Sequence, residues 1–174
     1  MTRPAVLRHR RAFLAAAFTT FAASALIACT STRGSAPTAA TPPTSTVTTL
    51  AGATVRIPAD KPAAVFFFSV GCGECLGGGK SLAQAAATVG DKAQFLAVDM
   101  DPGDSKDAIS GFLHAINSPE LPTAIDTGAT LSRAYQVSAL STLLVVDPAG
   151  KVTYRATDPT TDQIRAALAA AGAR

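Results

Sequence analysis

Residues 64–82 read AVFFFSVGCGECLGGGKSL, and this stretch decides how the chain folds. Residues 65–68 form an apolar run of β-branched and aromatic side chains that is too short for a helix, so we expect a buried strand. The strand leads into Cys72-Gly73-Glu74-Cys75, where we expect a helix to begin. Backbone N–H groups at the start of a helix stabilise an anion. Cys72 therefore lies where a thiolate is favoured, and Cys75, one turn further on, can form a disulfide with it.

A cysteine pair at this spacing has several interpretations: a redox dithiol, a pair of thiolate metal ligands, or a permanent structural disulfide. A structural zinc site needs four ligands, and the chain has no second Cys-x-x-Cys motif. His114 is expected on the solvent face of a helix, opposite its apolar stripe. Two thiolates alone can still bind a soft ion such as Cu(I). We favour the redox dithiol and predict no resident metal and no cofactor other than a reversible Cys72–Cys75 disulfide.

The charge of the chain is unevenly distributed. The formal net charge is +3, but four of the 15 basic residues lie within residues 1–28 and none of the 12 acidic residues does. The remainder therefore carries a net charge of −1, and the basic isoelectric point gives no reason to expect nucleic-acid binding.

The N-terminal residues resemble an export signal. Residues 12–27 are apolar or small apart from Thr19, Thr20 and Ser24, which is typical of a signal-peptide core. Arg10-Arg11 before this core resembles a twin-arginine signal, although a general secretory signal also carries basic residues there. Residues 26–29, Leu-Ile-Ala-Cys, resemble a lipobox, which implies cleavage after residue 28 and lipidation of Cys29.

Lipidation of Cys29 would also explain the odd number of cysteines, because it leaves Cys72 and Cys75 as a pair. The alternative is that Cys29 is an ordinary free cysteine. Acyl chains on Cys29 would anchor the protein to the membrane, because each buried CH2 group contributes about 0.8 kcal/mol. We therefore predict a location on the outer face of a bacterial cytoplasmic membrane, where conditions favour disulfides.

The composition divides the chain into three expected segments: a signal peptide over 1–28, a tether over 29–46 and a folded domain over 47–174. The tether is rich in Ser, Thr, Pro and Ala and cannot bury a core. Within the domain, strands alternate with helices, which predicts an α/β fold with a mixed sheet covered on both faces. The expected elements are a hairpin over 47–57, strands at 65–69, 94–100, 121–125, 143–146 and 151–155, and helices over 81–89, 105–117, 130–135 and after 159.

Two of the helices carry clear end signals. The helix over 105–117 has an apolar stripe and can be capped by Asp104 or Ser105. Thr160 and Gln163 fit a capping box at the start of the last helix. Between residues 76 and 80 three consecutive glycines weaken any helix, since each costs about 1 kcal/mol relative to alanine, and we expect a loose loop there. The alternative is a functional role, in which the bare backbone lets a protein partner approach the dithiol closely.

This order of elements resembles the thioredoxin-like family and, within it, the membrane-tethered thiol–disulfide reductases of the TlpA/ResA type. The resemblance covers about residues 47–172, and residues 105–125 are similar to the insertion that distinguishes this branch. It implies a thioredoxin-like three-layer sandwich, with Cys72 as the exposed nucleophile and Cys75 as the buried resolving cysteine. The implied partners are protein thiols and disulfides, together with an electron donor that the sequence does not identify.

Several positions depart from the family pattern. Glu74 lies between the cysteines and opposes a second negative charge, so Cys72 should be less acidic than in strongly oxidising relatives. Ser141, directly before Thr142, occupies the position of the usual cis-proline. A cis bond before a non-proline residue costs about 2.5–4 kcal/mol, so we expect a trans bond. This change implies altered substrate docking, access for a metal, or an inactive domain.

The acidic side chains raise a question of proton transfer. Phe66 holds the place of the buried acid that assists thioredoxin, so a proton from Cys75 must pass to water or to another group such as Glu74. Asp99, Asp101 and Asp126 lie at or after the ends of strands. Paired carboxylates can do acid–base work, but turn or capping roles are commoner, and we expect those. The predicted function is an extracytoplasmic, lipid-anchored thiol–disulfide oxidoreductase that reduces or exchanges protein disulfides. The alternative is a soft-metal thiolate-binding module or a redox-inactive interaction domain.

Overall fold

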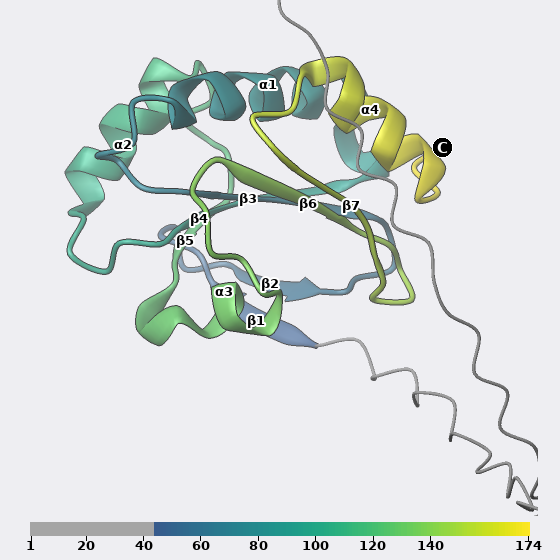
Figure 1. Ribbon diagram of the computed structural model, residues 1–174, viewed down its shortest axis with the longest axis horizontal. Coiled ribbons are helices and arrows are strands. Elements are labelled where there is room, and N and C mark those ends of the chain that lie inside the picture. The colour runs from purple at the N-terminus through teal and green to yellow at the C-terminus, as the bar shows by residue number, and fades with distance from the viewer. Residues whose placement is uncertain (1–43) are drawn as a thin grey trace, which may run out of the picture. The chain divides into compact units, whose positions relative to one another are not determined.

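A computed structural model describes residues 44–174, which contain a central sheet of five strands. Figure 1 shows how the helices surround this sheet. The strand order is β5-β4-β3-β6-β7. The middle strand, β3, is parallel to β4, which is parallel to β5, and antiparallel to β6, which is antiparallel to β7. The sheet is therefore mixed, as predicted. Its strands are β3 (Ala63–Phe68), β4 (Gln94–Asp99), β5 (Thr123–Ile125), β6 (Thr142–Val146) and β7 (Val152–Thr157).

Helices and a hairpin cover the two faces of this sheet. In Figure 1, α1 (Cys75–Val89), α2 (Lys106–Ala115) and α4 (Thr161–Ala170) lie on one side. The other side carries α3 (Thr130–Ala134) and the antiparallel hairpin of β1 (Ser45–Thr48) and β2 (Thr54–Ile57). A short 3-10 helix at Gly90–Lys92 directly follows α1, and another at Thr127–Ala129 directly precedes α3. The predicted three-layer α/β architecture is confirmed, and β1 begins slightly before the expected residue 47.

Strand β3 is buried on both faces, which explains its continuous apolar sequence. Phe66 and Phe68 pack in one core cluster, with residues of α1, α2 and α4. Val65 and Phe67 pack in the second cluster, on the side of α3 and the hairpin. The strand that precedes the cysteines is thus held rigidly from both sides.

The predicted helix caps are present. The Ser105 side chain accepts a hydrogen bond from the backbone of Ala108 at the start of α2. Thr160 and Gln163 form the predicted capping box at the start of α4. The apolar stripe of α2 faces the core, and His114 is exposed on the opposite side, as expected.

The glycine-rich stretch is not the loose loop that the sequence indicated. Residues 77–79 lie inside α1, and two of these glycines are required by close packing. A Cβ atom on Gly78 would lie 2.7 Å from the Phe66 ring and 2.8 Å from the Ser141 hydroxyl oxygen, and one on Gly79 would lie 3.0 Å from Phe112. Gly77 is different, since nothing lies within 4 Å of its Cβ position. Glycine lets α1 approach the sheet and the 139–142 loop, which propensity alone cannot indicate.

The export signal, the lipidation of Cys29 and nearly all of the tether lie outside the described residues. Within residues 44–174, none of the helices combines the length and the apolar character needed to cross a bilayer.

Candidate redox site

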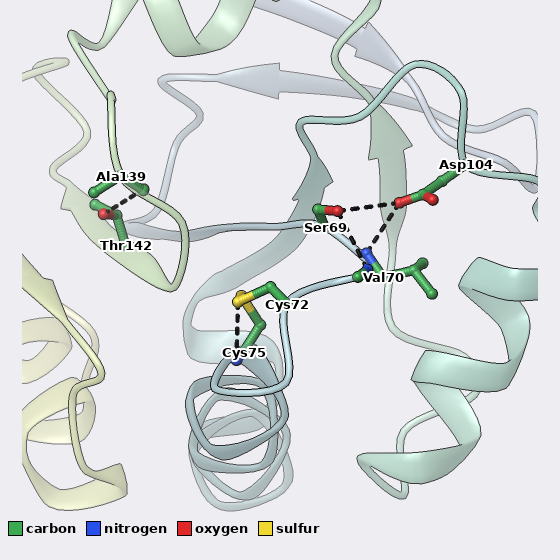
Figure 2. The surroundings of a disulfide bond; sticks show 8 residues. Ser69, Val70, Cys72, Cys75, Asp104, Ala139 and Thr142 are labelled. Carbon is green, nitrogen blue, oxygen red and sulfur yellow. Dashed lines mark hydrogen bonds between the residues drawn. A yellow bond between two sulfur atoms is a disulfide. The ribbon is translucent and has the colours of Figure 1, made fainter.

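Cys72 and Cys75 are joined by a disulfide bond, with a Cα–Cα distance of 5.3 Å (Figure 2). Cys75 is the first residue of α1, and it is fully buried. Cys72 precedes the helix in the turn that follows β3 and is partly exposed. Cys72 is thus the more accessible of the two residues, as expected.

The start of α1 directs a donor at Cys72. The backbone N–H of Cys75 donates to Cys72 Sγ over 3.2 Å and to the Cys72 carbonyl oxygen over 3.1 Å. Glu74 is the N-cap residue, but its side chain makes no capping hydrogen bond, and the first turn of α1 contains no acidic residue. The N–H group and the helix dipole therefore remain available to stabilise a thiolate on Cys72 after reduction.

The turn before Cys72 is held by a side chain from a distant loop. Asp104 Oδ2 accepts hydrogen bonds from the Val70 N–H over 2.9 Å and from the Ser69 hydroxyl over 3.4 Å (Figure 2). Ser69 Oγ in turn accepts from the Gly71 N–H over 3.3 Å, and the Ser69 carbonyl accepts from the Cys72 N–H over 3.1 Å. Asp104 thereby fixes the backbone that carries the exposed cysteine.

Sequence reasoning assigned Asp104 to a possible cap of α2, and Ser105 performs that role instead. The contact with Val70 spans 34 residues, so no local pattern indicates it.

The 139–142 loop packs against the start of α1 through Ser141. The Ser141 side chain is buried beside Gly78, its φ is 56°, and its Oγ has no hydrogen-bond partner among the described residues. In the described part of the chain the one cis peptide bond is Ile57–Pro58, so the predicted trans bond before Ser141 is confirmed. Thr142 uses its hydroxyl to donate to the Ala139 carbonyl over 2.7 Å.

The structure separates the roles of the three aspartates. Asp126 caps α3 by accepting from the N–H groups of Leu131 and Ser132, and Asp101 accepts from the Gly103 N–H in a turn, as expected. Asp99 also accepts a turn hydrogen bond, from the Asp101 N–H over 3.1 Å, but its carboxyl group is fully buried. Burial raises the pKa of Asp99 to about 6, with further upward contributions from the carboxylates of Asp104 and Asp101, against the lowering effect of the Asp101 N–H. The turn role of Asp99 was expected, but its burial was not, because an Asp at the end of a strand normally reaches solvent.

Two further features would affect the chemistry of the site: an acid at the position of Phe66 and a cluster of metal ligands. Phe66 is buried against Gly78, so its position offers no acid to the cysteines. Within residues 44–174 no cluster of three or more His, Cys, Asp or Glu side chains could hold a metal ion.

A groove of about 880 Å³ lies between α1 and the start of α4. Its lining includes Glu74, Gly77 and Gly78 on one side and residues 158–162 on the other. The Glu74 side chain between the cysteines is exposed along this groove. An extended segment lying in it would pass Glu74, which lies between the two cysteines in the sequence.

Comparison with solved structures identifies the fold. StoA from Bacillus subtilis matches with a TM-score of 0.62 and 18% identity, over 72% of this chain and 96% of that chain. A secreted Mycobacterium tuberculosis disulfide oxidoreductase homologous to E. coli DsbE matches with a TM-score of 0.60 and 22% identity, over 72% and 95%. The exposed lipoprotein thioredoxin Etrx1 from Streptococcus pneumoniae matches with a TM-score of 0.63 and 20% identity, over 74% and 99%. The fold is thioredoxin-like, and the Cys-x-x-Cys motif opens its first long helix.

No protein-family model matches the chain. However, the chain is 59% identical over 145 residues to the "Mercury resistance operon ORF3" protein of Streptomyces lividans, a region that covers 82% of this chain and 77% of that protein. The chain therefore belongs to the family of the Streptomyces lividans ORF3 protein.

Proposed function

We propose that the protein is a thiol–disulfide oxidoreductase that acts on protein thiols and disulfides. The observation that carries this proposal is the hydrogen bond from the Cys75 N–H to a partly exposed Cys72 Sγ, with the second sulfur buried one turn away. This arrangement suits a nucleophile and a resolving thiol. The thioredoxin-like fold supports the same assignment.

The reaction follows from the exposure of the two sulfur atoms. In the reduced protein the Cys72 thiolate attacks one sulfur of a substrate disulfide, which forms a mixed disulfide and releases the other substrate sulfur as a thiolate. Cys75, after losing its proton, attacks Cys72 Sγ and releases the second substrate sulfur. The substrate gains two electrons and the protein leaves as the Cys72–Cys75 disulfide. A dithiol donor must then reduce this disulfide in the same manner.

The direction of exchange depends on the charge around Cys72. The exposed carboxylate of Glu74 opposes a thiolate on Cys72 and so disfavours the reduced form of the dithiol. A dithiol whose reduced form is disfavoured is a weak oxidant. We therefore favour reduction or isomerisation of substrate disulfides. The groove between α1 and α4 is the proposed docking surface, because the bare backbone of Gly77 permits close approach of a partner chain.

We propose further that the protein is exported and anchored through Cys29. The residues that support this are Arg10-Arg11, the apolar core at 12–27 and the Leu-Ile-Ala-Cys motif at 26–29. Two proteins of similar fold are described as secreted or as an exposed lipoprotein.

A turnover assay with insulin or a glutathione mixed disulfide tests the redox proposal. The wild-type protein should turn over, and Cys72→Ser should lose all activity above background. Cys75→Ser should form a mixed disulfide with the substrate and stop there. Activity that survives Cys72→Ser would overturn the mechanism.

A second candidate function is capture of Hg(II) by the reduced dithiol, and the 59% identity to a protein of a mercury resistance operon favours it. Soft ions prefer thiolate ligands, and Cys72 and Cys75 supply two. Binding would form two S–Hg bonds and release the two thiol protons, with no change of oxidation state. Titration of the reduced protein with HgCl2 in the presence of glutathione should then give one bound Hg(II) per chain. Mass spectrometry measures this stoichiometry. Cys72→Ser should lose this retention, and equal loss of Hg(II) to glutathione from both proteins would exclude the function.

A further inference from the structure

Asp99 is a buried acidic group close to the site that the proposed exchange reaction does not use. It ends β4, where it pairs in register with Phe68 of β3 and with Ile125 of β5. Its side chain is fully buried, and Oδ2 has no donor directed at it. A buried carboxylate without a donor is unfavourable, whereas a buried carboxylic acid can donate its own proton.

The group placed to accept that proton is the carboxylate of Asp104, because Asp104 bonds to Ser69 and Val70, directly after Phe68, the residue that pairs with Asp99. Asp104 is the same residue that accepts from Val70 and Ser69 in the turn before Cys72. Asp104 is thus bonded to the backbone that carries Cys72 and lies on the side of that turn where Asp99 ends β4.

We propose that Asp99 is a positioning residue: in its neutral form it donates Oδ2–H to Asp104 and so holds the 69–71 turn, and with it Cys72, in place. The inference rests on the proposed role of Cys72 as the reactive sulfur. It adds a group that acts on Cys72 through the turn and that does not contact the substrate.

No cation competes for this pair among the described residues. The neighbouring strands contribute the uncharged Phe68 and Ile125, and Phe68 stacks on Phe112 of α2 at a centroid distance of 4.3 Å. The charged side chains at the start of α2, Lys106 and Asp107, are exposed, and the Asp126 carboxylate is engaged by the N–H groups of α3. The charges that face Asp99 are therefore the carboxylates of Asp104 and Asp101.

Ionisation of Asp99 changes its interaction with Asp104. Burial and the two carboxylates place its pKa at about 6, so the neutral form predominates below that pH and the charged form above it. Once charged, Asp99 loses its donor and repels Asp104, and the added negative charge behind the turn opposes a thiolate on Cys72. By linkage, titration of the Cys72 thiol should show a second inflection near the Asp99 pKa.

The test uses the reduced Cys75→Ser protein, in which Cys72 is the only thiol of the folded domain, and follows its ultraviolet thiolate absorbance against pH. Asp99→Asn keeps a donor toward Asp104 but cannot ionise, so the inflection near pH 6 should disappear. The matched control Asp107→Asn removes an exposed carboxylate at the start of α2 and should leave the inflection unchanged.

A second variant separates the hydrogen bond from the charge. Asp99→Leu has neither a donor toward Asp104 nor an ionisable group. The Val70 amide should therefore exchange with solvent about tenfold faster in Asp99→Leu than in Asp99→Asn, because one hydrogen bond to a charged group is lost. Persistence of the inflection in Asp99→Asn, or equal Val70 exchange in the two variants, would overturn the proposal. Neither readout requires substrate turnover, so failure of the proposed enzyme activity would leave this result interpretable.

Discussion

Glu74 is the charged side chain closest in sequence to both cysteines, and its effect on Cys72 is electrostatic. Because Glu74 is exposed and makes no capping bond, its carboxylate opposes a thiolate without any compensating contact to the helix start. The N–H group of Cys75 acts in the opposite direction. The balance of these two effects sets the tendency of the dithiol to be oxidised.

Glu74→Gln should lower the thiol pKa of Cys72 by roughly half a unit, the size expected for an interaction near the surface. The reduced form is then stabilised, and the dithiol should become more oxidising by about 15 mV. Equilibration with glutathione buffers measures this shift, which should shrink at high salt. Glu120→Gln, an exposed acid in the loop after α2, is the control, and an equal shift in both variants would contradict the assignment.

The raised pKa of Asp99 also has a consequence for stability. The folded protein holds this proton up to about pH 6, whereas the unfolded chain releases it near 3.8, so the contribution is complete below 3.8 and is lost as the pH rises through 6. Between pH 4 and pH 7 this group should lower the free energy of unfolding by up to about 3 kcal/mol. Denaturant unfolding of the oxidised protein should show a flatter pH dependence for Asp99→Asn than for the wild type. Identical slopes would mean that Asp99 is charged throughout.

At the scale of elements, α1 is shaped by what it packs against. Its sequence has low helix propensity between residues 77 and 79, yet the helix is continuous from Cys75 to Val89. Tertiary contact outweighs propensity here, because the Phe66 ring and the Ser141 side chain occupy the space that a side chain at residue 78 would need.

Gly78→Ala should therefore destabilise the protein by about 1–3 kcal/mol, since the Phe66 ring must shift, although alanine favours a helix. Gly77→Ala is the matched control, because its Cβ position is open and the substitution should stabilise α1 by up to about 1 kcal/mol. Denaturant unfolding of both variants measures the difference. Stabilisation of equal size by the two substitutions would contradict the observed packing.

For the molecule as a whole, the sequence predicted the features that depend on local pattern. The apolar run of β3, the cysteine spacing and the helix caps at Ser105 and Thr160 are all encoded within a few residues, and the structure confirms them. The roles of Asp99 and Asp104 could not be predicted in this way. The role of Asp104 depends on a loop meeting a turn that lies more than thirty residues away. The burial of Asp99 depends on what covers the end of β4, which the residues around it do not indicate.

Anchoring is the prediction that concerns the complete chain. In a bacterial host that processes lipoproteins, the wild-type protein should fractionate with the membrane, because acyl chains on Cys29 add buried hydrocarbon. Cys29→Ser should move the protein to the soluble fraction. Membrane fractionation followed by immunoblotting measures the distribution, and an unchanged distribution would exclude lipidation of Cys29 as the anchor.

The proposed mechanism requires that the helix start makes Cys72, and not Cys75, the reactive thiolate. The most direct measurement is alkylation of the reduced protein with limiting iodoacetamide, followed by peptide mass spectrometry at several pH values. We expect modification at Cys72 with an apparent pKa below the ordinary value of about 8.5 for a free cysteine, and Cys75 should stay protected. Faster modification of Cys75, or an apparent pKa for Cys72 above that value, would contradict the account.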